Sequence, residues 1–225
     1  MKKILLAGVF ALAGSAAFAD TFTYDGASIN PANVSVTISS PVARTVLAGE
    51  ITLNGAGPNT GTNLAVWCLD LFNSLVTNSL YTYQENMLTT AGAGGSNPAL
   101  TTLQITEIGD LMLSGDADLA AVQLAIWKVE YGANFTVLGA PPSETTEENK
   151  LLAEVQPGGA LYNTGVNVTL LHDAIVSPNQ SLAFAAPVPG PTLGGGLPGI
   201  LAGFAGLGMV GLQRSRKRRS NPIGA

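Results

Sequence analysis

Two apolar segments, one near each end of the chain, leave the residues between them to fold as one unit. Residues 1–19 combine two lysines, an apolar run and a final Ala-Phe-Ala, the small-x-small pattern that a signal peptidase reads. Residues 193–212 contain no charged residue, and as a helix they would span about 30 Å, the thickness of a bilayer core. We therefore predict a signal peptide at 1–19, a transmembrane helix at 193–212 and an ectodomain at 20–187.

The C-terminal segment has three parts in order: a proline motif, the apolar run and a basic cluster. The motif is Val188, Pro189, Gly190 and Pro191, and the cluster at 214–219 consists of Arg214, Arg216, Lys217, Arg218 and Arg219. Basic residues beside a membrane helix predict a cytoplasmic C-terminus, with the ectodomain outside. This order resembles the PEP-CTERM sorting signal, although Gly190 stands where that family has glutamate. The resemblance implies processing by an exosortase-like enzyme and delivery to the surface or extracellular matrix of a Gram-negative, exopolysaccharide-producing bacterium.

Charge is distributed unevenly along the chain. Only Arg44, Lys128 and Lys150 of the 10 basic residues lie in the ectodomain, together with all 15 acidic residues, which gives it a formal charge of −12. A basic face for phosphate groups is missing, so nucleic acid is excluded as a partner. The ectodomain is long enough to bury a core without disulfides.

Hydrophobic periodicity changes twice along the ectodomain. Alternating or β-branched runs predict strands at 32–40, 44–55, 63–72, 165–176 and 180–187. Helical periodicity predicts helices within 100–115, 116–132 and 145–159, the second capped by an aspartate and the third by Thr145 and Glu148 in capping-box spacing. Strands, then helices, then strands predict an α+β domain that is rich in β-structure.

The one cysteine, Cys68, lies in the apolar run NLAVWCLDLF. An exported protein with an unpaired cysteine has an intermolecular disulfide, an inert buried thiol or a thiol with other chemistry. In the second helix, Leu119, Val122, Ile126 and Val129 form an apolar stripe, and Gln123 borders it at about 40° from Leu119. A half-buried glutamine needs hydrogen-bond partners. The thiol and the carboxamide are thus both predicted to face the core.

The segments VWCLDL and AVQLAIW resemble the paired motifs of Cys-Gln thioester domains. In that family an aromatic-Cys motif and a Gln-x-Ala-Ile-Trp motif supply the two ends of an internal thioester. The resemblance assigns the bond to Cys68 and Gln123; the surrounding motif residues are Trp67, Asp70, Ala125, Ile126 and Trp127. It implies a covalent binder that transfers its acyl group once, and is therefore not an enzyme, to a surface amine or hydroxyl. Adhesion to a neighbouring surface, to exopolysaccharide or to another envelope protein would follow.

Other readings of the same residues stay open. Cys68 as an inert core thiol and Gln123 as an ordinary helix residue would describe a structural envelope or biofilm-matrix protein with no thioester and non-covalent binding. A sugar could then stack on Trp67, Tyr81 and Tyr83, unless these side chains serve the core. Cysteine hydrolysis is disfavoured because His172 is the only histidine. No calcium or zinc pattern is present, so we expect neither metal nor cofactor.

Overall fold

The computed structural model describes residues 19–24, 33–55, 63–76, 78–163, 165–173 and 180–188. Nearly all of them belong to a compact unit, residues 1–187, which is distinct from the unit 188–225. The predicted signal peptide up to residue 18, the proline motif after Val188, the helix at 193–212 and the basic cluster lie outside the described residues. Within the described ranges no helix has the length and apolarity needed to cross a membrane.

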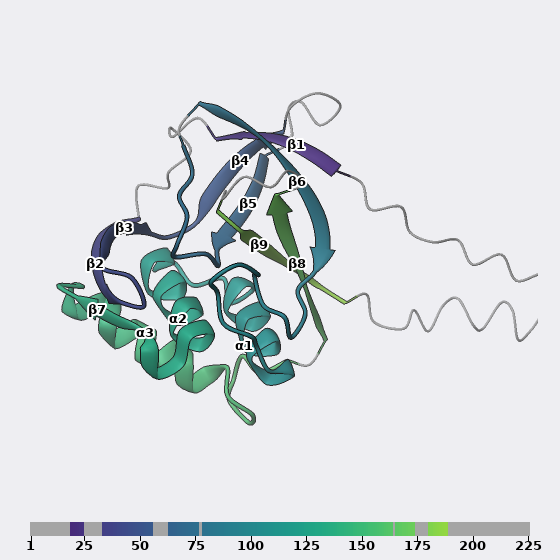
Figure 1. Cartoon of the computed structure of the whole chain (residues 1–225). Helices are drawn as coiled ribbons and strands as arrows, with labels where there is room; N and C mark the ends of the chain where they lie inside the picture. Colours follow the sequence, from purple (N-terminus) through teal and green to yellow (C-terminus); the bar gives the residue numbers. More distant parts are fainter. Residues whose placement is uncertain are drawn as a thin grey trace, which may run out of the picture. The chain divides into compact units, whose positions relative to one another are not determined.

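Six antiparallel strands close into a barrel in the order β1-β4-β5-β9-β8-β6 (Figure 1). The strands are β1 (Ala19–Tyr24), β4 (Ile51–Gly55), β5 (Asn63–Cys68), β6 (Ser79–Met87), β8 (Val166–Asp173) and β9 (Leu182–Pro187). Closure brings the N-terminal strand β1 next to β6, and it brings β9, from the end of the unit, next to β5. The predicted strands for β5, β8 and β9 are confirmed, whereas β1 and β6 were not predicted.

A second, smaller antiparallel sheet has the order β3-β2-β7. It consists of β2 (Val34–Ser40), β3 (Arg44–Ala48) and β7 (Thr136–Leu138). The predicted strand at 44–55 is divided between the two sheets, because the chain turns at Gly49, whose φ is 144°. A side chain at Gly49 would also overlap the Asn33 side chain, 1.7 Å from its Oδ1. This glycine therefore lets one apolar run contribute to two sheets.

Three helices lie together beside the barrel (Figure 1). They are α1 (Thr102–Met112), α2 (Leu119–Tyr131) and α3 (Pro142–Glu154), and the 3₁₀ turn Gly132–Asn134 follows α2. Helix α1 packs on β8 and β9, while α2 contacts α1, α3 and β3. Helices between two sets of strands confirm the α+β prediction, and the barrel makes the unit rich in β-structure.

The helix ends follow local chemistry in two of three cases. Thr101 and Gln104 form a capping box at α1, and Asp118 Oδ1 accepts a hydrogen bond from Ala121 N at 3.0 Å to cap α2. The predicted cap of α3 at Thr145 is wrong, since that helix begins at Pro142. Proline fits the first helical turn without losing a hydrogen bond, so the helix starts a turn earlier than the Thr-Glu spacing indicated.

Helix α2 is buried on nearly all sides instead of along one stripe. Eleven of its residues are buried, and Gln123, predicted to be half-buried, is 0% exposed. The reason is its position, since α1, α3, the second sheet and the end of β5 surround it. Helix α2 thus belongs to both hydrophobic clusters of the unit and connects them.

Helix α1 packs closely on β8 at Gly109. A Cβ atom there would lie 2.6 Å from Val166 Cγ1 and 2.9 Å from Val168 Cγ2. Alanine in place of a helix glycine normally stabilises by about 1 kcal/mol. We expect Gly109→Ala to lower the free energy of unfolding instead, by about 1–3 kcal/mol, because the added methyl group overpacks this contact. Urea unfolding of the purified chain measures the change.

A matched control shortens the valine side chain that the added methyl group would contact. Gly109→Ala combined with Val166→Ala should be more stable than the sum of the two single substitutions predicts, because the methyl group fills the volume that valine vacates. A Gly109→Ala variant as stable as the parent chain would contradict the proposed contact.

Candidate functional site

Cys68 is the last residue of β5, and its main chain is held by a side chain from α2. Strand β4 pairs with β5 only as far as Ile51 opposite Val66, so it ends before Cys68. The Gln123 amide takes the place of a strand partner: Cys68 N donates to Gln123 Oε1 at 3.0 Å, and Gln123 Nε2 donates to Cys68 O at 2.9 Å. The structure therefore brings the two predicted residues together, but it joins the amide of one to the backbone of the other.

One face of α2 continues this contact along the chain after Cys68. Gln123, Trp127 and Tyr131 are four residues apart, so their side chains lie on the same side of the helix. Tyr131 Oη accepts a hydrogen bond from Leu71 N at 3.2 Å and lies 3.0 Å from Leu69 O. The helix thereby fixes the backbone on both sides of the thiol.

The segment after Leu69 forms a tight turn around Asp70. Its Oδ1 accepts hydrogen bonds from Phe72 N at 2.8 Å and Asn73 N at 3.3 Å, and its Oδ2 accepts one from Asn73 Nδ2 at 2.6 Å. Arg44, on β3, holds the outside of the same turn. Its Nη1 donates to Leu71 O at 2.9 Å and to Asn73 O at 3.2 Å, and its Nη2 donates to the Ser74 hydroxyl.

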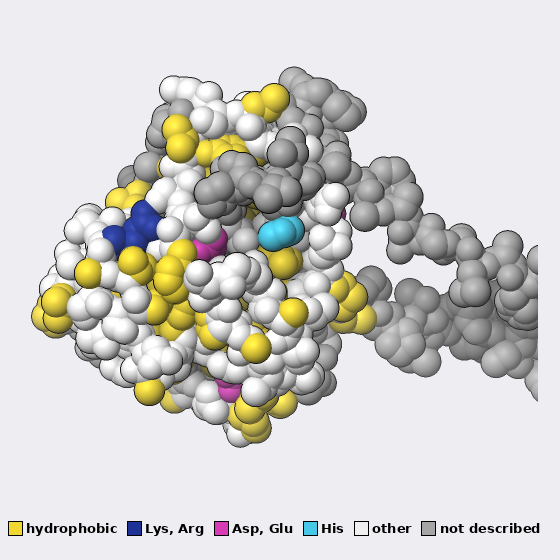
Figure 2. Space-filling model, viewed as in Figure 1, with side chains coloured by type: hydrophobic (Ala, Val, Ile, Leu, Met, Phe, Trp, Pro, Cys, Tyr) yellow, Lys and Arg dark blue, Asp and Glu magenta, His cyan; other side chains and the backbone are white. Residues whose placement is uncertain are grey.

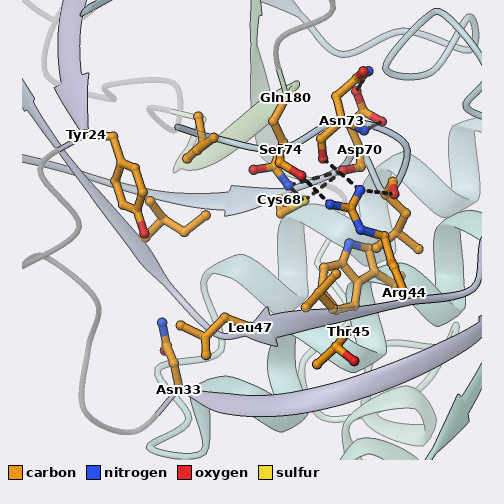
Figure 3. A pocket seen from close by; sticks show the side chains of 15 residues that line it. Tyr24, Asn33, Arg44, Thr45, Leu47, Cys68, Asp70, Asn73, Ser74 and Gln180 are labelled. Atoms are coloured by element: carbon orange, nitrogen blue, oxygen red, sulfur yellow. Dashed lines mark hydrogen bonds between the residues drawn. The ribbon is translucent and has the colours of Figure 1, made fainter. Parts of the chain in front are cut away.

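A second glutamine reaches the sulfur itself. Gln180 Nε2 lies 2.6 Å from Cys68 Sγ and 3.2 Å from Asp70 O (Figure 3). Because the amide C–N bond is about 1.3 Å long, the Gln180 carbonyl carbon is no more than about 4 Å from the sulfur. Reacting atoms in productive geometries lie about 3–3.5 Å apart. Of the described glutamines, Gln180 is the one whose amide makes a hydrogen-bond contact with the sulfur, whereas the Gln123 amide contacts the Cys68 main chain.

The sequence analysis did not single out Gln180. It lies just before β9, and pairing of Cys68 with Leu182 across β5 and β9 brings it to the sulfur. Its local signal is weak, since a glutamine before an apolar strand has no distinctive spacing to a cysteine 112 residues earlier. Barrel closure, a non-local feature, creates the contact.

Cys68 lines a cavity of about 200 Å³. The second sheet supplies one wall, including Arg44 and Leu47, while Trp127 of α2 and the turn at Asn73 and Ser74 supply others (Figure 3). Cys68 is only 2% exposed. A small group could therefore reach the thiol through this cavity, while bulk water is largely kept from it.

Burial is the main influence on the charged groups of the site. It raises the pKa of the Cys68 thiol, and the nearby carboxylates of Asp70 and Glu130 raise that pKa further. The indole of Trp127 lowers the pKa of the thiol, although its Nε1–H meets no acceptor with good hydrogen-bond geometry among the described residues. The thiolate is thus disfavoured, and a neutral product suits this environment better than a charged one.

A negative charge on the Glu130 carboxyl group would be unfavourable in this environment. It is 2% exposed, and neither of its carboxyl oxygens has a hydrogen-bond partner among the described residues. Burial, and then the charge of Asp70, raise the pKa of the Glu130 carboxyl well above its ordinary value. A protonated, neutral Glu130 follows from this placement.

Several other predicted residues are structural. Ala125, Ile126 and Trp127 are buried in the hydrophobic core, as are Trp67, Tyr81 and Tyr83, which excludes the last three as a surface platform for a sugar. His172 is exposed and does not line the cavity, so the described structure offers no cysteine-histidine pair. Among the described residues no group of His, Cys, Asp and Glu could hold a metal ion.

Comparison with known proteins gives limited matches. No family model matches the chain, and no curated protein matches its sequence. The structure is similar to the N-terminal thioester domain of a surface protein from Clostridium perfringens, with 15% identity and a TM-score of 0.46, covering 60% of this chain and 86% of that one. A cysteine-to-alanine mutant of the same domain gives 15% identity and a TM-score of 0.47, with coverage of 62% and 89%.

Replacing the buried acid Glu130 should change how stability depends on pH. Since the folded-state pKa is raised, the parent chain loses stability as the pH rises from the ordinary value of 4.5 toward the folded-state pKa. The variant Glu130→Gln has no proton to lose and should lack this part of the decline, becoming more stable relative to the parent chain as the pH rises. Urea unfolding at several pH values measures the difference.

Glu144→Gln on α3 serves as the control, because that residue is partly exposed. It should leave the pH dependence nearly unchanged. Parallel stability curves for the parent chain and Glu130→Gln would contradict a protonated Glu130.

Proposed function

We propose that this chain forms an internal thioester between Cys68 and Gln180 and uses it to attach covalently to a target. The observation that carries the proposal is the 2.6 Å separation of Gln180 Nε2 from Cys68 Sγ, where both residues line one cavity and the cysteine is almost completely buried. The sulfur lies at the end of β5 and Gln180 lies just before β9, and these strands are neighbours in the barrel, so the fold supports their proximity before any bond exists.

The chemistry needs no external reagent. The Cys68 sulfur attacks the Gln180 carbonyl carbon, the thiol proton passes to Nε2, and the C–N bond breaks to release ammonia. The product is a neutral acyl thioester, which suits a site that raises the pKa of the thiol. An incoming amine or hydroxyl then takes the acyl group and returns the thiol, leaving the protein joined to its target through Gln180. Each chain reacts once, as a binder and not as an enzyme.

Gln123 is the alternative partner that the motif resemblance indicates. In the structure the Gln123 side chain makes two hydrogen bonds with the Cys68 main chain: its Oε1 accepts from Cys68 N at 3.0 Å, and its Nε2 donates to Cys68 O at 2.9 Å. That arrangement supports a positioning role, in which Gln123 holds Cys68 in register at the end of β5. The two assignments make different predictions for which glutamine carries a label after reaction.

The biological setting that we propose follows from the terminal segments. An exported ectodomain with a PEP-CTERM-like tail would be processed by an exosortase-like enzyme, held in the membrane by its C-terminal helix until then, and delivered to the cell surface or matrix. Amine- or hydroxyl-bearing groups on a neighbouring surface or on exopolysaccharide would be its targets. This makes the chain an adhesin-like protein of the envelope or biofilm.

Intact mass of the purified chain tests the bond. We expect the parent chain to be lighter than its sequence by one ammonia, and Cys68→Ala and Gln180→Ala to have full mass. Gln123→Ala should still form the bond at lower yield, because it loses only the hydrogen bonds that orient Cys68. Methylamine should take the place of the lost ammonia, so that the product exceeds the sequence mass by one methylene group, and peptide mapping should place the N-methyl amide on Gln180.

Two results would contradict the assignment in different ways. Label on Gln123, with the bond retained in Gln180→Ala, would favour the alternative partner. Full mass in the parent chain, with a thiol that reacts only after unfolding, would identify Cys68 as a core residue and the protein as a non-covalent structural component of the envelope or matrix.

A further inference from the structure

We infer that Arg44 selects the acceptor, and that the preferred acceptor is an amine with a neighbouring carboxylate. The inference rests on the proposed thioester and adds the chemical class of its substrate. Its starting point is the cavity, where Arg44 lies in the same lining as Cys68 and Gln180. A molecule that reaches the sulfur therefore enters a space bounded by a guanidinium group (Figure 3).

Arg44 keeps its positive charge available for a ligand. Its described partners are two main-chain carbonyls and one hydroxyl, all of them neutral, and no described carboxylate pairs with it. The guanidinium has five N–H donors. Three are used in the turn, which leaves the Nε–H and one Nη2–H without a described partner. Arginine binds carboxylates through two such donors at once, a stronger and more directional contact than lysine makes.

Asp70 forms no ion pair with Arg44 in the described part of the chain. Although it also lines the cavity, both of its oxygens are used within the turn at Phe72 and Asn73, and the residue is 2% exposed. On the face shown in Figure 2, the dark blue Lys and Arg atoms form one small patch, and magenta Asp or Glu atoms are visible on the same face. In an ectodomain of formal charge −12, a cavity with an unpaired arginine is a specific place for an anionic group.

The reacting group of the acceptor is an amine because the cavity lacks a base. No histidine lines it, and the Asp70 oxygens are already hydrogen-bonded. A hydroxyl needs such a base to become a nucleophile, whereas a neutral amine attacks a thioester directly. The acidic ectodomain also attracts the ammonium form of an approaching amine. A lysine beside an acidic residue in a target peptide has both groups.

Three amines of equal length test the selection on the purified full chain. Propylamine carries no second group, β-alanine carries a carboxylate, and 1,3-diaminopropane carries a second amine. The rate of thioester loss with each is followed by intact mass and divided by the rate of the same amine with a small model thioester, which removes differences in intrinsic reactivity. We expect β-alanine to react about tenfold faster than propylamine, and 1,3-diaminopropane to react slowest.

Variants of Arg44 distinguish a role in selecting the acceptor from a purely structural role. Arg44→Gln should reduce the ratio of β-alanine to propylamine to about one, and Arg44→Lys should retain part of it. Lys150→Gln, at an exposed residue of α3, should leave the ratio unchanged. A purely structural Arg44 would alter all three rates together and preserve their ratios, so the ratio distinguishes the two roles.

Four outcomes would overturn the inference. One is equal normalised rates of β-alanine and propylamine in the parent chain, which decides the matter even if Arg44→Gln fails to fold. Another is an unchanged ratio in Arg44→Gln. Faster reaction of 3-hydroxypropanoate than of β-alanine would assign the site to hydroxyl acceptors such as uronic acids. A chain with no ammonia loss, which reacts with none of the probes, would overturn the proposed thioester and this inference together.

Discussion

Two hydrogen bonds between the Gln123 amide and the Cys68 main chain join helix α2 to the end of strand β5, beyond the point where β5 pairs with β4. Strand β4 ends before Cys68, so the backbone there would otherwise face the core without partners. Buried backbone groups without partners cost about 1–3 kcal/mol each. By supplying both a donor and an acceptor, Gln123 lets β5 extend to the thiol and fixes α2 against the end of the barrel. The positions of Trp127 and Tyr131 follow from that anchor, because they lie on the same face of α2.

Around these two hydrogen bonds the core contains more buried polar side chains than folding stability alone would favour. Asp70, Gln123 and Glu130 are all at most 2% exposed, and Glu130 has no hydrogen-bond partner among the described residues. Hydrophobic side chains of similar size would avoid the desolvation cost. Polar groups in such a place accord with a site that has chemistry to perform. Burial and the carboxyl groups of Asp70 and Glu130 raise the pKa of the Cys68 thiol, so the proposed conversion to a neutral thioester would remove a titratable group from an environment that opposes ionisation.

The parts of the structure that local patterns control were predictable from the sequence. Alternation identified β2, β5, β8 and β9, and the aspartate before α2 identified its start. Non-local features were not predictable. Nothing near Gly49 indicated that one apolar run would serve two sheets, and the burial of α2 depends on neighbours far apart in the sequence. The site shows the same division: Cys68 and Gln123 were brought together as expected, whereas the contact of Gln180 with the sulfur requires β9 to close the barrel beside β5.

The groups of the proposed bond and the residues that bound its cavity come from different parts of the fold. The sulfur and the two glutamines belong to the barrel and α2, which are tied together through the core. The outer wall of the cavity belongs to the second sheet, whose strand β3 reaches the Asp70 turn through Arg44. A substitution on β3 at a lining residue that does not bond to this turn, such as Leu47, would therefore change the cavity wall while leaving the contacts of Arg44 in place. Because the proposed chemistry requires the barrel only to bring a thiol and a carboxamide together away from water, the same pair of groups would serve different targets if the second sheet varied.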